Sequence, residues 1–418
     1  MTAARRVTLL LFLHPITLLA EPPWQFESAV VVSGARNGGH HFYHHLDSSG
    51  RRNIAVSEQY IAIAWEDDRD ATPRIYLGYK ETTDSKFSQA LQISGEGEAY
   101  EPSIVPLSED RFVIAWEENG TIHARLALLH DRLQLGAIVK LDNEASSQVS
   151  LSAHGERIIA VWSQRSGRFG RIYTKQLHVT ADGKLKIKHG CAVDSLPPSD
   201  DQLYPTAAFS GDRLVVAWED RRPKHTIIMA AAEQPANSCR FSNPVRISEK
   251  PEGRNLPYGA GHGVSRVAMG SYGEQGLFAV WADKRDFRDG YDIWGAPLIA
   301  DEKLFGDNQK VQDDFGGLSK QRHATIAGAR DGTLIVAWDD EREGDTDLVM
   351  SWLEDGNWSD DWPVSVASGE GQQGNPSIAL DSLGNLHMSW VQRESVGGPT
   401  QLKYAFGKMA VKTGYPLD

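Results

Sequence analysis

The chain has 418 residues, of which 40% are hydrophobic and 24% are charged, and it contains 39 glycines. This composition excludes a disordered or fibrous protein and is typical of a folded protein rich in turns. The formal net charge of −13 at pH 7 argues against nucleic acids and anionic membrane surfaces as partners.

The N-terminus has the pattern of a secretory signal peptide. A positively charged start at Arg5 and Arg6 precedes an apolar run from Val7 to Ala20. This run is too short for a good membrane span, and no later segment contains about 18 uninterrupted apolar residues. We therefore expect residues 1–20 to be a signal peptide, residues 21–418 to form one domain, and the protein to reach the periplasm or the extracellular space.

A tryptophan recurs seven times, each time at the end of a short β-prone run such as IAIAW, LVVAW or LIVAW. Successive tryptophans are 46 to 63 residues apart. This spacing is typical of a repeat that forms one four-stranded blade of a β-propeller. We expect these tryptophans to pack between neighbouring blades. They are Trp65, Trp116, Trp162, Trp218, Trp281, Trp338 and Trp390.

Each repeat also has segments for the other strands of a blade. EPSIVPL at 101–107 precedes a tryptophan run and predicts an inner strand, RIYLGY at 74–79 predicts a third strand, and FSNPVRIS at 241–248 predicts an outer strand. The segment QFESAVVVS at 25–33 matches the outer strand, and no such segment follows residue 405. The sequence therefore predicts an all-β, seven-bladed propeller of four-stranded blades, closed by an N-terminal strand that pairs with the last blade.

Four repeats continue past the tryptophan as W-x-D-x-R. We expect the Asp and Arg to pair with each other or to brace the adjacent blade, because a brace is needed at every blade. The alternative is a ring of ligand pockets, in which Tyr76 and Trp294 would help to hold a sugar. The four motifs run from Trp65 to Arg69, from Trp218 to Arg222, from Trp281 to Arg285 and from Trp338 to Arg342.

With the strands that follow it, this motif resembles the sialidase-like (BNR-type) repeats of exported and cell-surface bacterial β-propellers. The resemblance extends over residues 25–405 and implies carbohydrate binding or a glycosidase that acts on acidic sugars. True sialidases are six-bladed and carry Asp boxes of the type S-x-D-x-G-x-x-W and an F/Y-R-I-P start, and both motifs are absent here. No catalytic residue is therefore assigned.

The W-x-D-x-R loops share one face of a propeller with the longest connections, so we expect that face to carry the function and the opposite face to be inert. Three arginines there could converge on a carboxylate or sulfate, or could brace acidic loops. Three tyrosines could stack on a sugar ring or seal the mouth of the ring. These candidate ligand-binding residues are Arg52, Arg266, Arg322, Tyr100, Tyr204 and Tyr258.

The first long loop is rich in histidine, at His40, His41, His44 and His45. Imidazole is a common ligand of transition metals, so a zinc or copper ion could bind there. The alternative is a polar loop without a metal, and no other cofactor is indicated.

Cys191 and Cys239 are the only cysteines and are expected near the outer strands of adjacent blades. In an exported protein they could form a disulfide or remain two isolated thiols. The preferred functional hypothesis is an exported propeller that binds a glycan or a protein partner. A sialidase-like glycoside hydrolase and a scaffold subunit of an envelope complex are the alternatives.

Overall fold

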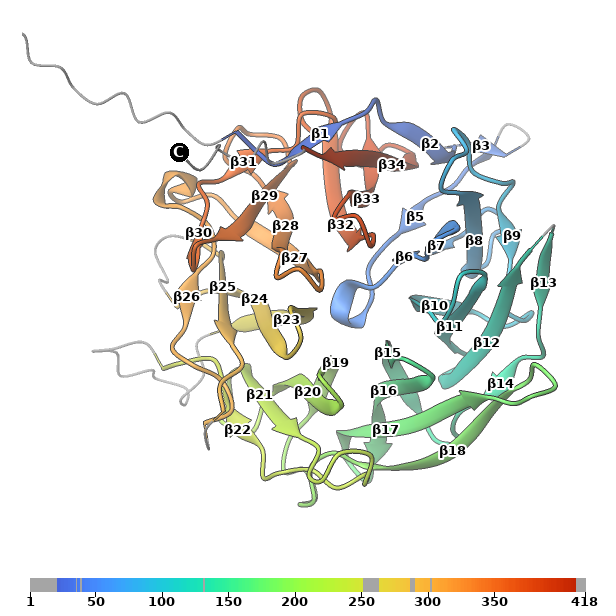
Figure 1. Cartoon of the computed structure of the whole chain (residues 1–418), viewed down its shortest axis with the longest axis vertical. Helices are drawn as coiled ribbons and strands as arrows, with labels where there is room; N and C mark the ends of the chain where they lie inside the picture. The colour runs from blue at the N-terminus through green and yellow to red at the C-terminus, as the bar shows by residue number, and fades with distance from the viewer. Residues whose placement is uncertain are drawn as a thin grey trace, which may run out of the picture.

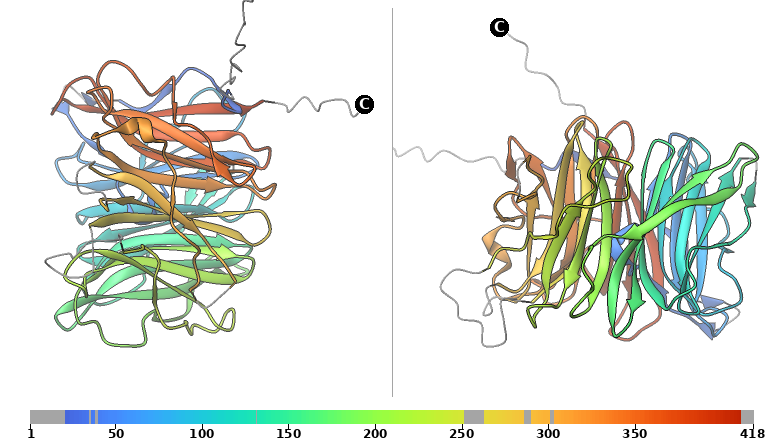
Figure 2. Two further views of the ribbon diagram at one scale, coloured as in Figure 1. Left: turned by 90° about the vertical axis from the view of Figure 1, so that its left-hand side faces the viewer. Right: turned by 90° about the horizontal axis from the view of Figure 1, so that it is seen from below.

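The computed structural model describes residues 21–34, 36–37, 40–130, 132–250, 263–285, 290–300 and 303–410, with the backbone alone for residues 36, 37 and 40. Seven antiparallel sheets surround a central axis as the blades of a propeller (Figure 1). Seen from the side, the strands run between the two faces of the ring (Figure 2). The fold class predicted from the tryptophan repeat is confirmed.

Blades 1 to 4 follow one another along the chain, each built from the axis outward. Blade 1 contains β5 (His44–His45), β6 (Ile54–Val56), β7 (Tyr60–Asp67), β8 (Arg74–Glu81) and β9 (Leu91–Gln92). Blade 2 contains β10 (Ala99–Pro106), β11 (Arg111–Glu118), β12 (Thr121–Leu129), β13 (Leu133–Leu135) and β14 (Val139–Lys140). Blade 3 contains β15 (Ser146–His154), β16 (Arg157–Ser166), β17 (Phe169–Val179) and β18 (Leu185–Ala192). Blade 4 contains β19 (Gln202–Ser210), β20 (Arg213–Asp220), β21 (Ile227–Ala232) and β22 (Val245–Arg246).

Blades 5 to 7 complete the ring. Blade 5 contains β23 (Val264–Tyr272), β24 (Gly276–Asp283), β25 (Asp292–Pro297) and β26 (Gln309–Lys310). Blade 6 contains β27 (Gln321–Gly328), β28 (Leu334–Asp340), β29 (Asp347–Glu354), β30 (Asn357–Trp358) and β31 (Trp362–Pro363). Blade 7 contains β32 (Gln372–Leu380), β33 (Leu386–Arg393), β34 (Thr400–Met409), β1 (Trp24–Phe26) and β2 (Val30–Ser33). A hairpin of β3 (Arg36–Asn37) and β4 (His40–His41) and two 3-10 turns, η1 (Ser49–Arg51) and η2 (Asp314–Gly316), lie outside the blades.

The core lies between the blades. In the described chain, the buried apolar residues form seven clusters, one at each interface between neighbouring blades. A second strand such as β20 is buried over nearly its whole length because blades pack against both of its faces. This double burial explains why the tryptophan runs are continuously apolar and do not alternate. All seven repeat tryptophans have an exposed fraction of 0%.

In six blades the buried indole N–H of the repeat tryptophan donates to the side chain two residues later. Burying this donor without a partner would cost about 1 to 3 kcal/mol, so an acceptor at this spacing stabilises the blade. The acceptors, with their distances from the indole nitrogen, are Asp67 (2.8 Å), Glu118 (2.8 Å), Gln164 (3.3 Å), Asp220 (3.1 Å), Asp283 (2.9 Å) and Asp340 (3.2 Å).

The arginine of each W-x-D-x-R motif binds the same carboxylate, and Arg69 and Arg222 also extend toward the preceding blade. Arg222 donates to Asp220 through Nε at 2.9 Å and Nη2 at 2.7 Å, and its Nη1 lies 3.1 Å from Asp194 of blade 3. In the same way, Arg69 of blade 1 donates to Ser33 of β2 at 3.0 Å. The motif is therefore a brace within and between blades.

The aromatic rings beside these arginines are covered by them. The guanidinium of Arg69 lies 4.0 Å from the ring centre of Tyr76, and that of Arg285 lies 3.8 Å from the ring centre of Trp294. These stacking contacts stabilise the braces. They also occupy the ring faces that a sugar would need.

The N-terminal strands belong to the last blade. Both β1 and β2 pair antiparallel with β34, with Trp24 opposite Met409 and Val30 opposite Tyr404. Trp24 is buried, and its indole N–H donates to the backbone oxygen of Gly384 at 2.8 Å. Blade 7 therefore combines the two ends of the described chain.

The inner strand of blade 1 is interrupted by a segment that fills the centre of the ring. Both β5 and β6 pair with β7, and residues 46–53, here named the central segment, leave the sheet between them. Figure 1 shows this part of the chain, which includes η1, in blue at the centre. Gly50 has φ +70°, and a Cβ there would lie 2.6 Å from Thr206 Oγ1, so a glycine is required.

Side chains of the central segment bind several blades. Ser49 Oγ donates to the backbone oxygen of Pro205 at 2.6 Å. Asn53 Nδ2 donates to the backbone oxygen of Pro102 at 3.1 Å, and Asn53 N donates to Ser377 Oγ at 3.0 Å. These bonds fix the segment to blades 2, 4 and 7.

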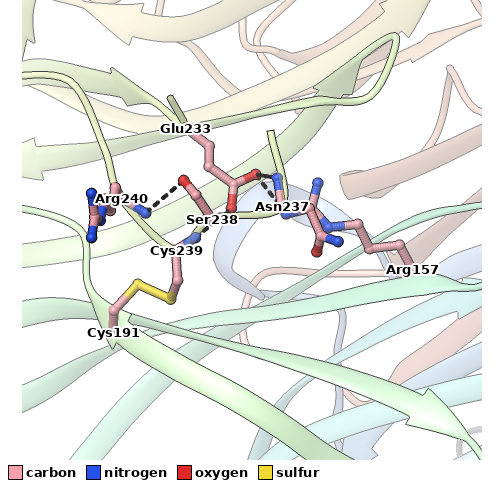
Figure 3. Close-up of a disulfide and its surroundings, with 7 residues drawn as sticks. All are labelled: Arg157, Cys191, Glu233, Asn237, Ser238, Cys239 and Arg240. Carbon is pink, nitrogen blue, oxygen red and sulfur yellow. Dashed lines mark hydrogen bonds and ion pairs between the residues drawn. A yellow bond between two sulfur atoms is a disulfide. The ribbon is translucent and has the colours of Figure 1, made fainter. Parts of the chain in front are cut away.

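Cys191 and Cys239 form a disulfide that joins β18 of blade 3 to the loop between β21 and β22 of blade 4 (Figure 3). Glu233 holds the same loop, because its carboxylate accepts the N–H of Cys239 and of Asn237, both at 2.9 Å. Its other contact is Arg157 Nη2 of blade 3 at 2.6 Å. The two blades are thus joined by a covalent bond and an ion pair.

No helix in the described part of the chain is long and apolar enough to cross a membrane.

We predict that Asp220→Asn destabilises the protein. The substitution removes one of the two buried carboxylates that pair with Arg222, and Asp194 remains. We expect the free energy of unfolding to fall by roughly 2 to 3 kcal/mol, which is below the full cost of breaking a buried pair because Arg222 is partly exposed and keeps Asp194. Thermal unfolding checks this against Asp212→Asn, because the side chain of Asp212 is 92% exposed. Equal midpoints for the two variants would contradict the brace.

We also predict that the double variant Cys191→Ser/Cys239→Ser is less stable than the oxidised protein. The bond closes a loop with a sequence separation of 48 residues, for which loop-closure entropy predicts on the order of 2 to 4 kcal/mol. The measurement is the thermal midpoint of both proteins with and without reductant. Reductant should lower the midpoint of the wild type alone.

Candidate functional site

The inner strands bulge at the same point, close to where each begins. In β10, β15, β19, β23, β27 and β32 the register with the second strand shifts there. One residue at each bulge has a positive φ, and Arg51 of the central segment has the same conformation in blade 1. These seven ring residues, with their φ values, are Arg51 (54°), Glu101 (49°), Gln148 (65°), Tyr204 (47°), Arg266 (58°), His323 (55°) and Asn375 (54°).

None of the seven ring residues is a glycine. Glycine adopts positive φ without a steric penalty, whereas other residues do so at a cost. Such strain persists where the surroundings enforce it, and it clusters at functional sites. The ring therefore retains seven side chains at positions where glycine would relieve the strain.

Several ring residues meet at the axis, on the face where the inner strands begin, here named the loop face. Arg266 lies with its guanidinium 3.7 Å from the ring centre of Tyr204, and its Nη2 is 3.0 Å from Asp47 of the central segment. Arg51 Nη2 lies 3.6 Å from Asp47 and 3.3 Å from Asn375 Oδ1. We name Asp47, Arg51, Glu101, Tyr204, Arg266, His323 and Asp339 the central cluster.

Acidic residues directly after the repeat tryptophans support the bulges of the next blade. Glu219 Oε1 accepts the backbone N–H of Arg266 at 2.7 Å, and Asp339 Oδ1 accepts that of Asn375 at 2.9 Å. Glu66 does the same for Glu101 at 3.3 Å. Asp339 also binds His323 Nδ1 through its other oxygen. The sequence reasoning missed these residues, although an acid directly after the tryptophan was a visible signal in several repeats.

The carboxyl groups of the central cluster differ in acidity. Burial, reinforced by the charge of Asp47, raises the pKa of Glu101 to about 8. Burial also raises the pKa of Glu66 to about 7. Burial acts in the same direction on Asp47, but the charges of Arg51 and Arg266 outweigh it and lower the pKa of that carboxyl. At neutral pH a protonated Glu101 therefore faces the field of an ionised Asp47.

Four polar atoms of the central cluster are buried and have no hydrogen-bond partner in the described structure. They are Asp47 Oδ1, Arg51 Nε, Glu101 Oε2 and Arg266 Nη1. Each such atom costs about 1 to 3 kcal/mol, and buried polar groups in native proteins are nearly always satisfied. Two acceptors and two donors thus lie at one place without a hydrogen bond, and Asp47 Oδ1 has only the ion pair with Arg51 Nη2 at 3.6 Å.

The structure brings together two of the predicted ligand-binding residues and separates the others. Tyr204 and Arg266 are in contact in the central cluster. Tyr100 donates from its hydroxyl to Glu98 Oε2 at 3.0 Å. Tyr258 lies outside the described residues.

The three candidate arginines occupy different environments in the structure. Arg322 lies one residue before the bulge of β27, and its guanidinium is 5.3 Å from the ring centre of Tyr291. Arg52 points along the axis, where it donates to the backbone oxygens of Leu151 at 2.8 Å and Met269 at 3.1 Å. Arg52 follows a left-handed residue in an excursion from the sheet, and the sequence did not reveal this change of direction.

The predicted metal-binding histidines have unlike surroundings. His44 is buried, its Nδ1 is 2.9 Å from Thr400 Oγ1, and burial lowers its pKa to about 3. His41 and His45 are exposed, and the side chain of His40 is not described. Within the described ranges, no three His, Cys, Asp or Glu side chains are grouped as metal ligands.

No family model and no curated protein sequence matches this chain. Solved structures match it in fold. One is a protein of unknown function from Dyadobacter fermentans, with a TM-score of 0.55, 13% identity, and coverage of 93% of this chain and 100% of the other. Another is the polysaccharide lyase Uly1, with a TM-score of 0.56, 9% identity, and coverage of 92% of this chain and 98% of the other. At these identities the likeness shows the shared propeller fold.

Proposed function

We propose that this protein is an exported propeller that binds a glycan at the central cluster of its loop face. The observation that carries the proposal is the set of unpartnered acceptors and donors on Asp47, Glu101, Arg51 and Arg266. A sugar hydroxyl both donates and accepts a hydrogen bond, so neighbouring hydroxyls complement such a mixed set. Asp47 and Arg266 keep 37% and 22% of their side-chain surface exposed, so a ligand can reach them.

The balance of charge selects among glycans. The carboxylates of Asp47 and Asp339 oppose the positive charges of Arg51 and Arg266, while Glu101, whose pKa is raised to about 8, is protonated and neutral. Asp47 pairs with both arginines, and Asp339 supplies the second negative charge. A carboxylate from a sugar would compete with them, so we favour neutral, hydroxyl-rich sugars over the acidic sugars that convergent arginines would have bound.

Two further observations support the proposal. The propeller fold is shared with the polysaccharide lyase Uly1, although fold likeness alone does not assign a function. Export is supported by the signal-peptide pattern in residues 1–20 and by the disulfide between Cys191 and Cys239, because disulfides persist in oxidising compartments.

We predict that Arg266→Ala weakens glycan binding at least tenfold. The substitution removes a donor and the stacking partner of Tyr204, while the backbone N–H that binds Glu219 remains. The measurement is a glycan array with neutral, sialylated and sulfated members, followed by titration of the best ligand. Arg168→Ala, an exposed arginine in the β16–β17 loop of the same face, should bind as the wild type does. Equal affinity of both variants would contradict the central cluster as the site.

A second candidate function is glycoside hydrolysis, and one observation favours it. Glycosidases use two carboxyl groups, one protonated and one ionised, whose environments separate their pKa values. Glu101, with its raised pKa, and Asp47, with its lowered pKa, meet this condition. Glu101→Gln should abolish any turnover of a bound glycan and retain its binding. If a glycan binds the wild type and no reducing ends are released, hydrolysis is refuted and only the binding function remains.

We predict a pH dependence of stability that comes from Glu101. Its folded pKa of about 8 exceeds its ordinary value of 4.5, so the folded state holds a proton that the unfolded state releases. The free energy of unfolding therefore falls as pH rises from about 5 to about 8. Denaturant titrations across this range should give a smaller fall for Glu101→Gln than for the wild type. Identical slopes would refute the raised pKa.

A further inference from the structure

The opposite face of the ring, which the sequence predicts to be inert, contains a cavity at the axis. It has a volume of about 570 Å³ and lies where the inner strands of blades 3 to 6 end and turn into the second strands. Its walls include His154, Phe209, Glu274 and Arg330, and Arg52 of the central segment reaches it from within the ring. Volumes of this order are typical of small-molecule sites.

Arg52 lies in this cavity with most of its hydrogen-bonding capacity unused. A guanidinium has five N–H donors. Nη1 of Arg52 donates to the backbone oxygen of Leu151, and Nη2 donates to that of Met269. Both acceptors are neutral carbonyls, so these bonds anchor the side chain and leave its charge uncompensated.

No carboxylate of the described residues pairs with Arg52. Burial alone lowers the pKa of Arg52 to about 10, whereas Asp47 acts against the lowering for Arg51. Arg52 therefore stays charged at neutral pH. Arg52 is only partly exposed, and a charge that is largely removed from water is usually paired, because leaving it isolated is costly. The missing partner would be an anion from outside the chain.

The charged side chains that line the cavity favour an anion, because Arg52 and Arg330 together outnumber the carboxylate of Glu274. Arg330 is exposed there and adds a second positive charge. His154 Nε2 lies 3.6 Å from Asp212, whose side chain is 92% exposed and is not among the residues that line the cavity. Glu274 is the acidic side chain that lines the cavity, and it is exposed at its edge.

We propose that this cavity binds a small molecule through an oxyanion group, either a phosphate, a sulfate or a carboxylate, held by the guanidinium of Arg52. The planar guanidinium can donate two parallel hydrogen bonds to such a group. The site is separate from the central cluster, since the two lie at opposite ends of the inner strands. The central segment thus contributes a charged residue to each face of the ring.

The test is a calorimetric titration of the whole mature protein with sodium phosphate, sodium sulfate and sodium acetate, each against sodium chloride at equal ionic strength. We expect saturable binding of at least one of the three oxyanions and none of chloride. The strongest of the three identifies the group. The proposal would be overturned if chloride gave the same heat of binding as the oxyanions, or if none of the three oxyanions gave any.

Two variants locate the site. Arg52→Gln should lose at least tenfold in affinity for the oxyanion, and Arg330→Glu, an exposed change that leaves the anchor bonds of Arg52 intact, should weaken it several-fold. Arg330→Glu decides the matter if Arg52→Gln does not fold. Arg266→Ala should bind the oxyanion as the wild type does, so a failure of the glycan proposal and a failure of this one are distinguishable. Unchanged affinity in both cavity variants would refute the assignment.

Discussion

The hydrogen bond from the buried tryptophan indole to a side chain two residues later, which forms in six of the seven blades, is the interaction on which the ring depends. The tryptophan fills the interface with the preceding blade, and its N–H needs an acceptor that enters the same buried layer. An aspartate at that spacing then requires a cation, and the arginine two residues further on supplies it. Arg222 also extends toward Asp194 of blade 3. This short motif therefore ends a strand, holds the loop that follows it and joins two sheets.

Blade 7 shows what happens without this arrangement. Trp390 is followed two residues later by Gln392, and its indole nitrogen has no hydrogen-bond partner in the described structure. This blade is completed by β1 and β2 from the other end of the chain, and Trp24 packs edge-on against Trp352 of blade 6 at 6.1 Å between ring centres. In blade 7, the pairing of β1 and β2 with β34 therefore contributes stability that the tryptophan hydrogen bond contributes in the other six blades.

The repeat could be predicted from the sequence because local patterns define it. These patterns are the tryptophan runs, the W-x-D-x-R loops and the outer strand at residues 25–33. The central cluster could not be predicted from the sequence, because it depends on contacts between blades. Arg266 and Tyr204 are 62 residues apart in sequence, and Asp47 reaches them only because the central segment leaves blade 1. No local pattern shows that residues 46–53 fill the axis, so the sequence did not indicate the direction of Arg52.

The contrast between repeated and unrepeated positions indicates where function lies in this ring. The brace positions carry the same Asp and Arg in four blades, as a structural requirement would impose. The seven ring residues share one backbone conformation, yet they carry arginine, glutamate, glutamine, tyrosine, histidine and asparagine. A purely structural bulge would be served by glycine in every blade. The seven ring residues therefore have different side chains on the same strained backbone conformation. This is best explained by a site in which each blade contributes a different group to one ligand.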